Sequence, residues 1–252
     1  MPSKKSILYI IPVSADRQRI ERINTWLNEF KEPDTEVDVI CLENGPEHLT
    51  YHLFEHVAID RILEKLLTLE KKYDAIVVAC FYDPGARELR ELMDAPVVFP
   101  AEACMHVAAM LGHRFSIIVA KRKCIPRMLD NAKTYGLESR LASMRSIDIP
   151  VVEVRASPEA IKERILQECR RAVEDDLAEV IVMGCTAFER ICQDLQKELG
   201  IPVVDPVVVT FKVAELLATL KIKLGLAHSR TYLGELELGY GFSELDHLLK
   251  LR

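Results

Sequence analysis

The sequence holds little that would suit a membrane or a nucleic acid. Aromatic residues make up only 6% of the chain, with a single tryptophan, and no run of about 18 apolar residues is present to span a bilayer. Lys and Arg number 33 against 39 Asp and Glu, so the net charge is −6 and a basic stripe for phosphate contacts is lacking. We therefore expect neither a membrane nor a nucleic acid as a partner.

Cysteine is present, but not in paired spacing. There are seven cysteines, an odd number, and no Cys-x-x-Cys pair, which disfavours both a disulfide framework and a structural zinc site. The short apolar stretch near the amino terminus lacks a small-residue cleavage site after it, so we expect no signal peptide. We interpret the cysteines as reduced thiols and expect a cytoplasmic protein.

Apolar strand-like runs alternate with amphipathic helical runs through most of the 252 residues. This alternation predicts βαβ units and parallel sheets. We expect strands at Ser6–Ile11, Val37–Leu42, Ala75–Ala79, Val97–Phe99, Phe115–Val119, Val151–Val154, Glu179–Met183 and Val203–Val204. We expect helices at Arg17–Phe30, Ile59–Lys71, Ala86–Leu92, Pro158–Asp175 and Val208–Lys223.

The two halves of the chain resemble each other. An apolar strand ends at a cysteine in each half, and a Pro-Val-Val-x-Pro stretch follows. Cys80 and Cys185 lie 105 positions apart, and Pro96 and Pro202 lie 106 apart. This duplication predicts two pseudo-symmetric, doubly wound (flavodoxin-like) α/β lobes with parallel sheets and an active site in the cleft between them. The first lobe would take residues 1–101 and 206–252, and the second would take residues 102–205.

Cys80 and Cys185 are the candidate catalytic residues, because ligands bind beyond the carboxyl ends of parallel strands. We expect a helix to begin near Phe188, and Asp83 to cap a helix whose first turn contains Pro84. A helix start favours thiolate. A thiolate that takes a proton from carbon, with a thiol on the other face to return one, inverts a stereocentre without a cofactor. The substrate would be a small carbonyl or carboxylate compound with an acidic C–H bond.

Residues beside the two cysteines are candidates for substrate binding. Gly184 allows a close turn, and the Thr186 hydroxyl can donate a hydrogen bond. The set comprises Phe81, Tyr82, Asp83, Gly184, Thr186 and Ala187. A strand-end cysteine is often just a small buried apolar residue, and we give that interpretation to the other five: Cys41, Cys104, Cys124, Cys169 and Cys192.

The stretch from Tyr73 to Ala103 closely resembles the hydantoin racemase branch of the aspartate/glutamate racemase superfamily. Its matching motifs are Ala79-Cys80-Phe81-Tyr82-Asp83-Pro84-Gly85, Pro96-Val97-Val98 and Ala101-Glu102-Ala103. Gly184-Cys185-Thr186 looks like the Gly-Cys-Thr of aspartate and glutamate racemases. The resemblance covers about residues 6 to 220 and implies a cofactor-independent two-base racemase that uses Cys80 and Cys185. Ser14 stands where that branch has an Asn-Pro-Asn motif, and we add it to the substrate-binding set.

Other functions remain open on the sequence alone. A maleate-type cis-trans isomerase or an arylmalonate-type decarboxylase would use the same fold, and a two-lobed ligand-binding protein would need no turnover. Two retained cysteines disfavour the single-thiol decarboxylase. We expect a homo-oligomer, and we interpret Thr231–Arg252 as an oligomer-forming arm in preference to a short helix packed on its own lobe. His48, His52 and His56, spaced four apart, are interpreted as one partly exposed helix face and not as a metal site.

Overall fold

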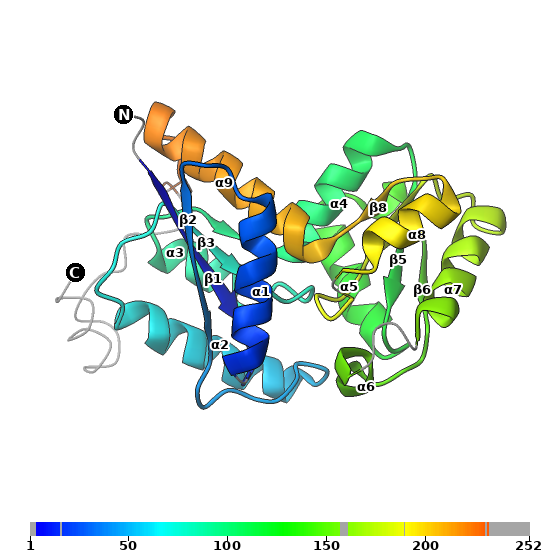
Figure 1. Cartoon of the computed structure of the whole chain (residues 1–252), viewed down its shortest axis with the longest axis horizontal. Helices are drawn as coiled ribbons and strands as arrows, with labels where there is room; N and C mark the ends of the chain where they lie inside the picture. The colour runs from blue at the N-terminus through cyan, green and yellow to red at the C-terminus, as the bar shows by residue number, and fades with distance from the viewer. Residues whose placement is uncertain (1–3, 16, 157–160, 189, 230, 232–252) are drawn as a thin grey trace. The chain divides into compact units, whose positions relative to one another are not determined.

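We describe a computed structural model that covers residues 4–15, 17–156, 161–188, 190–229 and 231. The chain divides into two compact units (Figure 1). Unit 1 takes the residues up to Val77, then Pro84–Val97, then those from Ala214 onward. Unit 2 takes Val78–Asp83 and Val98–Val213. The chain therefore passes from one unit to the other several times.

The first parallel sheet is built from the amino-terminal strands in the order β2-β1-β3-β4. These strands are β1 (Lys5–Ile11), β2 (Thr35–Cys41), β3 (Ala75–Val78) and β4 (Val97–Val98). In the parallel β1–β2 pair, Lys5 lies opposite Thr35 and Ile11 opposite Cys41. The associated helices are α1 (Arg17–Phe30), α2 (His52–Leu67) and α3 (Ala86–Leu92).

The second sheet repeats the order of the first as β6-β5-β7-β8, with parallel pairing throughout. Its strands are β5 (Phe115–Val119), β6 (Leu141–Ser146), β7 (Val180–Met183) and β8 (Val203–Val204). The helices around it are α4 (Pro100–Leu111), α5 (Cys124–Thr134), α6 (Val151–Ala156), α7 (Lys162–Glu174) and α8 (Cys192–Leu199), with a 3₁₀ turn, η1, at Glu138–Arg140. Helix α9 (Pro206–Leu224) follows β8. The equal strand orders confirm the predicted doubly wound fold and its duplication.

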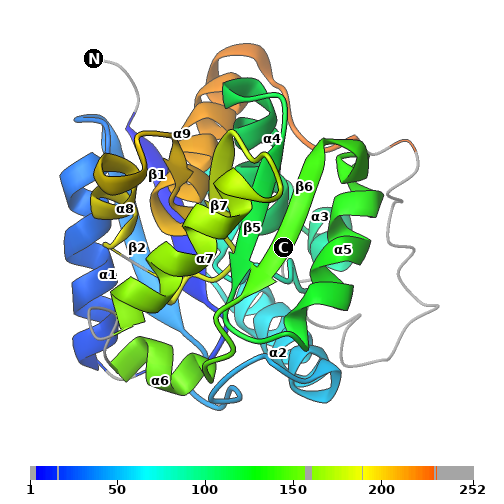
Figure 2. The same ribbon diagram turned by 90° about the vertical axis from the view of Figure 1, so that its right-hand side faces the viewer.

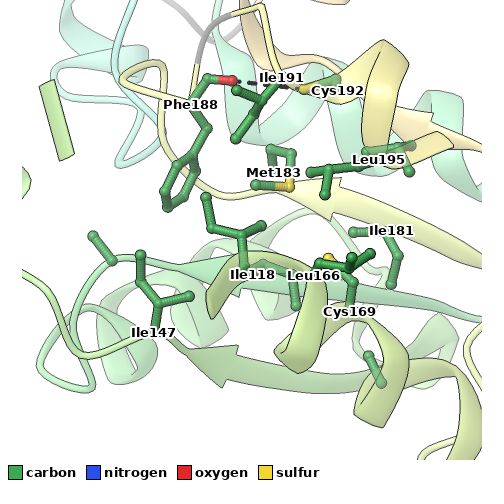
Figure 3. Close-up of a cluster of buried hydrophobic side chains, with 14 of the residues drawn as sticks. Ile118, Ile147, Leu166, Cys169, Ile181, Met183, Phe188, Ile191, Cys192 and Leu195 are labelled. Atoms are coloured by element: carbon green, nitrogen blue, oxygen red, sulfur yellow. Dashed lines mark hydrogen bonds between the residues drawn. The ribbon is translucent and has the colours of Figure 1, made fainter. Parts of the chain in front are cut away.

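The core of unit 2 explains why several cysteines are structural. Alternate residues of β5 and β7, among them Ile118 and Ile181, pack against α7 and α8 (Figure 3). Cys169 on α7 and Cys192 on α8 are buried in this cluster, where the Cys192 thiol reaches the Phe188 carbonyl oxygen at 3.7 Å. Helices α4 and α5 pack against each other outside this cluster, as do α7 and α8 within it (Figure 2).

One predicted strand is wrong. Val151–Val154 lies in helix α6, and the strand of this region is β6, ten residues earlier. Pro150 explains the helix, because its carbonyl oxygen accepts hydrogen bonds from the amides of Glu153 and Val154, and proline suits a first helical turn. Strand β6 was not predicted because it is an edge strand whose residues are all half-buried and do not form an apolar run.

The other predicted strands are each found within two residues of their expected bounds, and α1 and α3 have the expected bounds. Helix α2 begins at His52, seven residues earlier than expected. The predicted amino-terminal end of α7 and the proposed Thr231–Arg252 arm lie outside the described residues, apart from Thr231. The predicted domain boundaries stay a prediction. Among the described residues, no helix combines the length and apolar character needed to cross a bilayer.

Candidate active site

Cys80 and Cys185 occupy equivalent positions in the two sheets. Each lies two residues beyond the last residue of its strand, β3 or β7, and each is half-buried. Both belong to unit 2, since this unit includes the segment after β3. The Thr186 hydroxyl donates a hydrogen bond of 3.2 Å to the Ala79 carbonyl oxygen. The residue after one cysteine is therefore tied to the residue before the other.

The Cys185 turn depends on a close approach of two backbones. The Gly184 amide donates to the Ile118 carbonyl oxygen at 2.8 Å. A Cβ atom on Gly184 would lie 2.8 Å from Ile117 Cγ2 and 2.9 Å from that same carbonyl oxygen, so a side chain does not fit here. This geometry agrees with the close turn expected at Gly184.

The expected helix start at Phe188 is wrong. Helix α8 begins at Cys192, seven residues after Cys185, and a turn fills the space between. Within that turn the Ala187 amide points at the Cys185 sulfur at 3.5 Å. A hydrogen bond from a backbone amide favours a thiolate over a thiol, so the turn supplies what the helix start was expected to supply.

The Cys80 turn also differs from expectation. The Asp83 amide donates to the Cys80 carbonyl oxygen at 3.0 Å and closes a tight turn. Asp83 has φ +53°, in the left-handed region that Asp and Asn tolerate better than most residues. Helix α3 begins only at Ala86, after Gly85 with φ +71°, so Pro84 precedes the helix and Asp83 does not cap it.

Asp83 caps a different helix, α4. The Ala101 amide donates to Asp83 Oδ1 and the Glu102 amide donates to Asp83 Oδ2, each at 2.9 Å. These amides lie in the first turn of α4, where backbone donors have no partner within the helix. The Tyr135 hydroxyl donates a third hydrogen bond to Asp83 Oδ2 at 2.7 Å. The carboxylate is therefore committed to three donors and has only 4% of its surface exposed.

Burial raises the pKa of Asp83 to about 7, although the hydrogen bonds from Tyr135, Ala101 and Glu102 act in the opposite direction. Desolvation thus outweighs three donors at this carboxyl group. The protonation of Asp83 therefore changes near neutral pH, and the free energy of unfolding should depend on pH in this range.

Helix α5 holds the segment between Cys80 and Asp83 through two further side chains. Arg127 Nη2 donates to the Tyr82 carbonyl oxygen at 3.0 Å, and Asn131 Nδ2 donates to the same oxygen at 3.1 Å. Arg127 also donates to Asn131 Oδ1 at 2.7 Å. These residues were not predicted from the sequence, although Arg127 and Asn131 share one face of α5 and Tyr135, the residue directly after the helix, continues the same four-residue spacing.

Three cysteine thiols influence the ionisation of the Tyr82 phenol. Its hydroxyl shares a hydrogen bond with Cys124, and it interacts electrostatically with Cys124, Cys80 and Cys185. Burial and these interactions raise the pKa of Tyr82 far above its ordinary value. The hydroxyl consequently stays protonated and remains a hydrogen-bond donor. Cys124, given a purely structural role above, is buried at the start of α5 and contacts this candidate site.

The remaining predicted site residues have different surroundings. Ser14 is half-buried in unit 1, where its amide donates to the Pro46 carbonyl oxygen at 2.9 Å. The side chains of Phe81 and Ala187 lie in unit 2 beside the cysteines and are 2% and 4% exposed. These two side chains therefore contribute mainly to the packing of the core. The structure therefore gathers the predicted residues of both cysteine turns in one unit and leaves Ser14 in the other.

The histidine series does not form one helix face. His48 precedes α2, and its ring packs in a tilted arrangement against Tyr51 and Phe54 at ring-centroid distances of 5.8 and 5.3 Å. His52 is exposed and lies 3.6 Å from the Glu55 carboxylate. In the part of the chain that the structure covers, no group of three His, Cys, Asp or Glu side chains could hold a metal ion.

Fold and site together define a class: duplicated α/β proteins in which a cysteine follows the third strand of each parallel sheet. The chain belongs to the Asp/Glu/hydantoin racemase family, whose model matches residues 8–214. It is thus an isomerase of the racemase type.

Individual relatives agree with this assignment. A hydantoin racemase of Pseudomonas sp. (strain NS671) is 34% identical over 211 residues, which cover 81% of this chain and 85% of the relative. The solved allantoin racemase of Klebsiella pneumoniae is 30% identical with a TM-score of 0.86, covering 97% of this chain and 99% of the other. The allantoin racemase of Pseudomonas fluorescens is 27% identical with a TM-score of 0.84, covering 90% and 95%.

Proposed function

We propose that the protein is a cofactor-independent racemase of hydantoins that carry a substituent on the carbon beside a ring carbonyl, with Cys80 and Cys185 as its two bases. The equivalent placement of these cysteines in one unit, tied by the bond from Thr186 to Ala79, carries the proposal. The names of the relatives supply the substrate class: hydantoin racemases, and allantoin racemases, whose substrate contains the same ring.

In this mechanism, one cysteine acts as a thiolate and removes the proton from the stereocentre, and the other, as a thiol, delivers a proton to the opposite face. The roles exchange for the opposite enantiomer. The amide of Ala187 stabilises the anionic form of Cys185. The hydroxyl of Tyr82, which stays protonated, is the side-chain donor that we assign to the enolate oxygen.

Deuterium exchange tests the assignment. In deuterium oxide at neutral pH, each enantiomer of a 5-substituted hydantoin is incubated with the parent protein, Cys80→Ser or Cys185→Ser, and analysed by chiral chromatography with mass detection. We expect the parent to racemise both enantiomers. Each variant should exchange the proton of only one enantiomer, opposite for the two variants, with little inversion, because the carbanion has no acid on its far face.

Cys41→Ser is the matched control, since Cys41 is also half-buried but lies at the end of β2 in unit 1. It should racemise at the parent rate. Labelling of the same enantiomer by both variants, or racemisation at the parent rate by either, would exclude the two-thiol mechanism. If the protein released carbon dioxide from an arylmalonate, or converted a maleate to its trans isomer, it would be a decarboxylase or a cis-trans isomerase instead.

We further propose that the protein is a cytoplasmic homo-oligomer. Its seven cysteines are all free thiols, the usual state in reducing compartments, and closed symmetric dimers are the commonest assembly of soluble proteins. Cell fractionation tests the location, and light scattering at working concentration tests the assembly. A monomer in solution would exclude the second part.

A further inference from the structure

We propose that Asp83 is a positioning residue for Cys80: its carboxylate ties the Cys80 turn to the start of α4 and to α5, and so fixes the direction from which Cys80 meets the substrate. This inference rests on the two-thiol mechanism proposed above. It gives Asp83 a role through another residue in place of the substrate contact expected from the sequence.

The hydrogen bonds of Asp83 support this role. Its amide closes the turn onto the Cys80 carbonyl oxygen, and its carboxylate accepts from the Ala101 and Glu102 amides and from the Tyr135 hydroxyl. A side chain that is 4% exposed and already holds three donors has little capacity left for a substrate. The same residue thus joins the turn that carries Cys80 to two separate helices of unit 2.

The backbone of Asp83 supports it independently. A φ of +53° is strained for most side chains, and glycine is the residue that adopts it most easily. An aspartate here retains some strain but adds the carboxylate that α4 and Tyr135 require. Held by the hydrogen bonds of that carboxylate, the turn has few ways to relax. The two requirements can be separated by mutation, because glycine satisfies the backbone alone and asparagine satisfies the backbone and part of the hydrogen bonding.

The contacts predict an asymmetric effect. Cys185 is held by its own turn, through Gly184 and Ala187, and neither residue bonds to Asp83. The bond from Thr186 joins that turn to Ala79, on the other side of Cys80 from Asp83. Loss of the carboxylate should therefore displace Cys80 more than Cys185. Racemisation rates alone do not reveal this, since the two enantiomers are equally stable and their kcat/KM values must fall together. Proton exchange by each enantiomer separately does reveal it.

The experiment measures deuterium exchange of each pure enantiomer by the parent, Asp83→Gly, Asp83→Asn and Tyr135→Phe. The enantiomer served by Cys80 is identified as the one that Cys185→Ser still labels. We expect Asp83→Gly to lose about 100-fold of that exchange, the scale of a displacement of about 1 Å, and to keep exchange of the other enantiomer within about threefold. The rate at which Asp83→Asn and Tyr135→Phe exchange that enantiomer should lie between the rates of the parent and of Asp83→Gly, because each of these variants keeps part of the hydrogen bonding.

Glu168→Gln is the matched control, because Glu168 is another buried carboxylate of unit 2 and contacts Arg145 on β6 and Arg171 on α7. It should change both exchanges equally or not at all. An equal loss for both enantiomers in Asp83→Gly would reduce Asp83 to a structural role and overturn the inference, as would parent-like exchange of both.

A second readout does not need turnover. The alkylation rates of Cys80 and Cys185 are measured by mass mapping in the parent and in Asp83→Gly. We expect the rate at Cys80 to change at least about threefold and the rate at Cys185 to stay constant. If the two alkylation rates change in this pattern but the parent exchanges no hydantoin proton, the proposed function is contradicted and Asp83 is still the support of Cys80. Equal changes at both thiols would overturn the inference while leaving the proposed function intact.

Discussion

The seven thiols of this chain differ in their surroundings far more than the sequence suggests. Cys80 and Cys185 are half-buried, as is Cys41, whose sulfur reaches the Ala15 carbonyl oxygen at 3.5 Å. The other four are buried, and desolvation is the largest influence that raises the pKa of the Cys104, Cys169 and Cys192 thiols. A thiol with a raised pKa carries little thiolate at neutral pH and reacts slowly.

Alkylation should therefore separate the cysteines. With limiting iodoacetamide at pH 7, we expect Cys80 and Cys185 to be modified before the other five, and a competitive hydantoin analogue to protect both. Peptide mapping by mass spectrometry gives the order directly. Early labelling of Cys169 or Cys192, which lie in the core between the sheet and α7 and α8, would contradict both the site assignment and the packing described for unit 2.

Single residues also show what could be inferred before the structure and what could not. The pair Cys80 and Cys185 was selected because the repeat placed both after equivalent strands. Arg127, Asn131 and Tyr135 were missed because their partners lie 45 to 52 positions away, so no local pattern records the contact. Asp83 was recognised as a cap, but its partner helix was α4, not the helix next in sequence.

Among the secondary structure elements, the end of β7 is the most constrained part of the site. It passes so close to β5 that a Cβ atom on Gly184 would meet both a side chain and a backbone oxygen of that strand. Gly200, after α8, has φ +70° and open space around its Cα. The two glycines are therefore required for different reasons, close approach in one case and backbone conformation in the other.

This contrast gives a test. Gly184→Ala should lower the free energy of unfolding by about 1–3 kcal/mol through overpacking and reduce racemisation by at least about tenfold, because β7 must shift and Cys185 moves with it. Gly200→Ala should lower the free energy of unfolding by about 1 kcal/mol through backbone strain and leave the racemisation rate unchanged. Urea unfolding and chiral chromatography measure the two effects. Equal activity losses in both variants would show that stability alone, and not the position of Cys185, is responsible.

The strands and helices were predictable where burial was strong. Strands β5 and β7 are buried along their whole length and apolar except for Ser116, and their predicted bounds agree with the structure within one residue. Edge strand β6 is half-buried at every position and carries Arg145, so its sequence offers no strand signal. The valines of α6 favour a strand when the sequence is considered alone. The hydrogen bonds from Glu153 and Val154 to the Pro150 carbonyl oxygen stabilise a helix instead.

The stability of the whole molecule should depend on pH through Asp83. Its pKa is raised by burial to about 7 from the ordinary 3.8, so the folded state favours the neutral acid. The stability that this group contributes is fully present below about pH 4 and is lost as the pH rises through 7, by at most about 1.4 kcal/mol per pH unit. Carboxylates with lowered pKa, such as Asp38 and Asp176, act with the opposite sign and below pH 4.

Comparison of the parent with Asp83→Asn isolates this effect. Between pH 5 and pH 8, the free energy of unfolding from urea titrations should fall with rising pH more steeply for the parent than for the variant. Every other titrating group is shared and cancels in the difference. A difference between the two proteins that stays constant over this range, or grows in favour of the parent as the pH rises, would show that Asp83 is already ionised at pH 5.

The repeated passage of the chain between the two units bears on how the protein is made. Unit 1 contains β1, β2 and parts of β3 and β4 of the first sheet, which is synthesised before the second sheet, yet it also takes the part of α9 that begins at Ala214. Unit 2 needs Val78–Asp83 from the first half and closes at Val213. Domains usually fold in the order of their synthesis, but here the unit begun first is completed last. The nascent chain must carry unit 1 without its part of α9 through the synthesis of the whole second sheet.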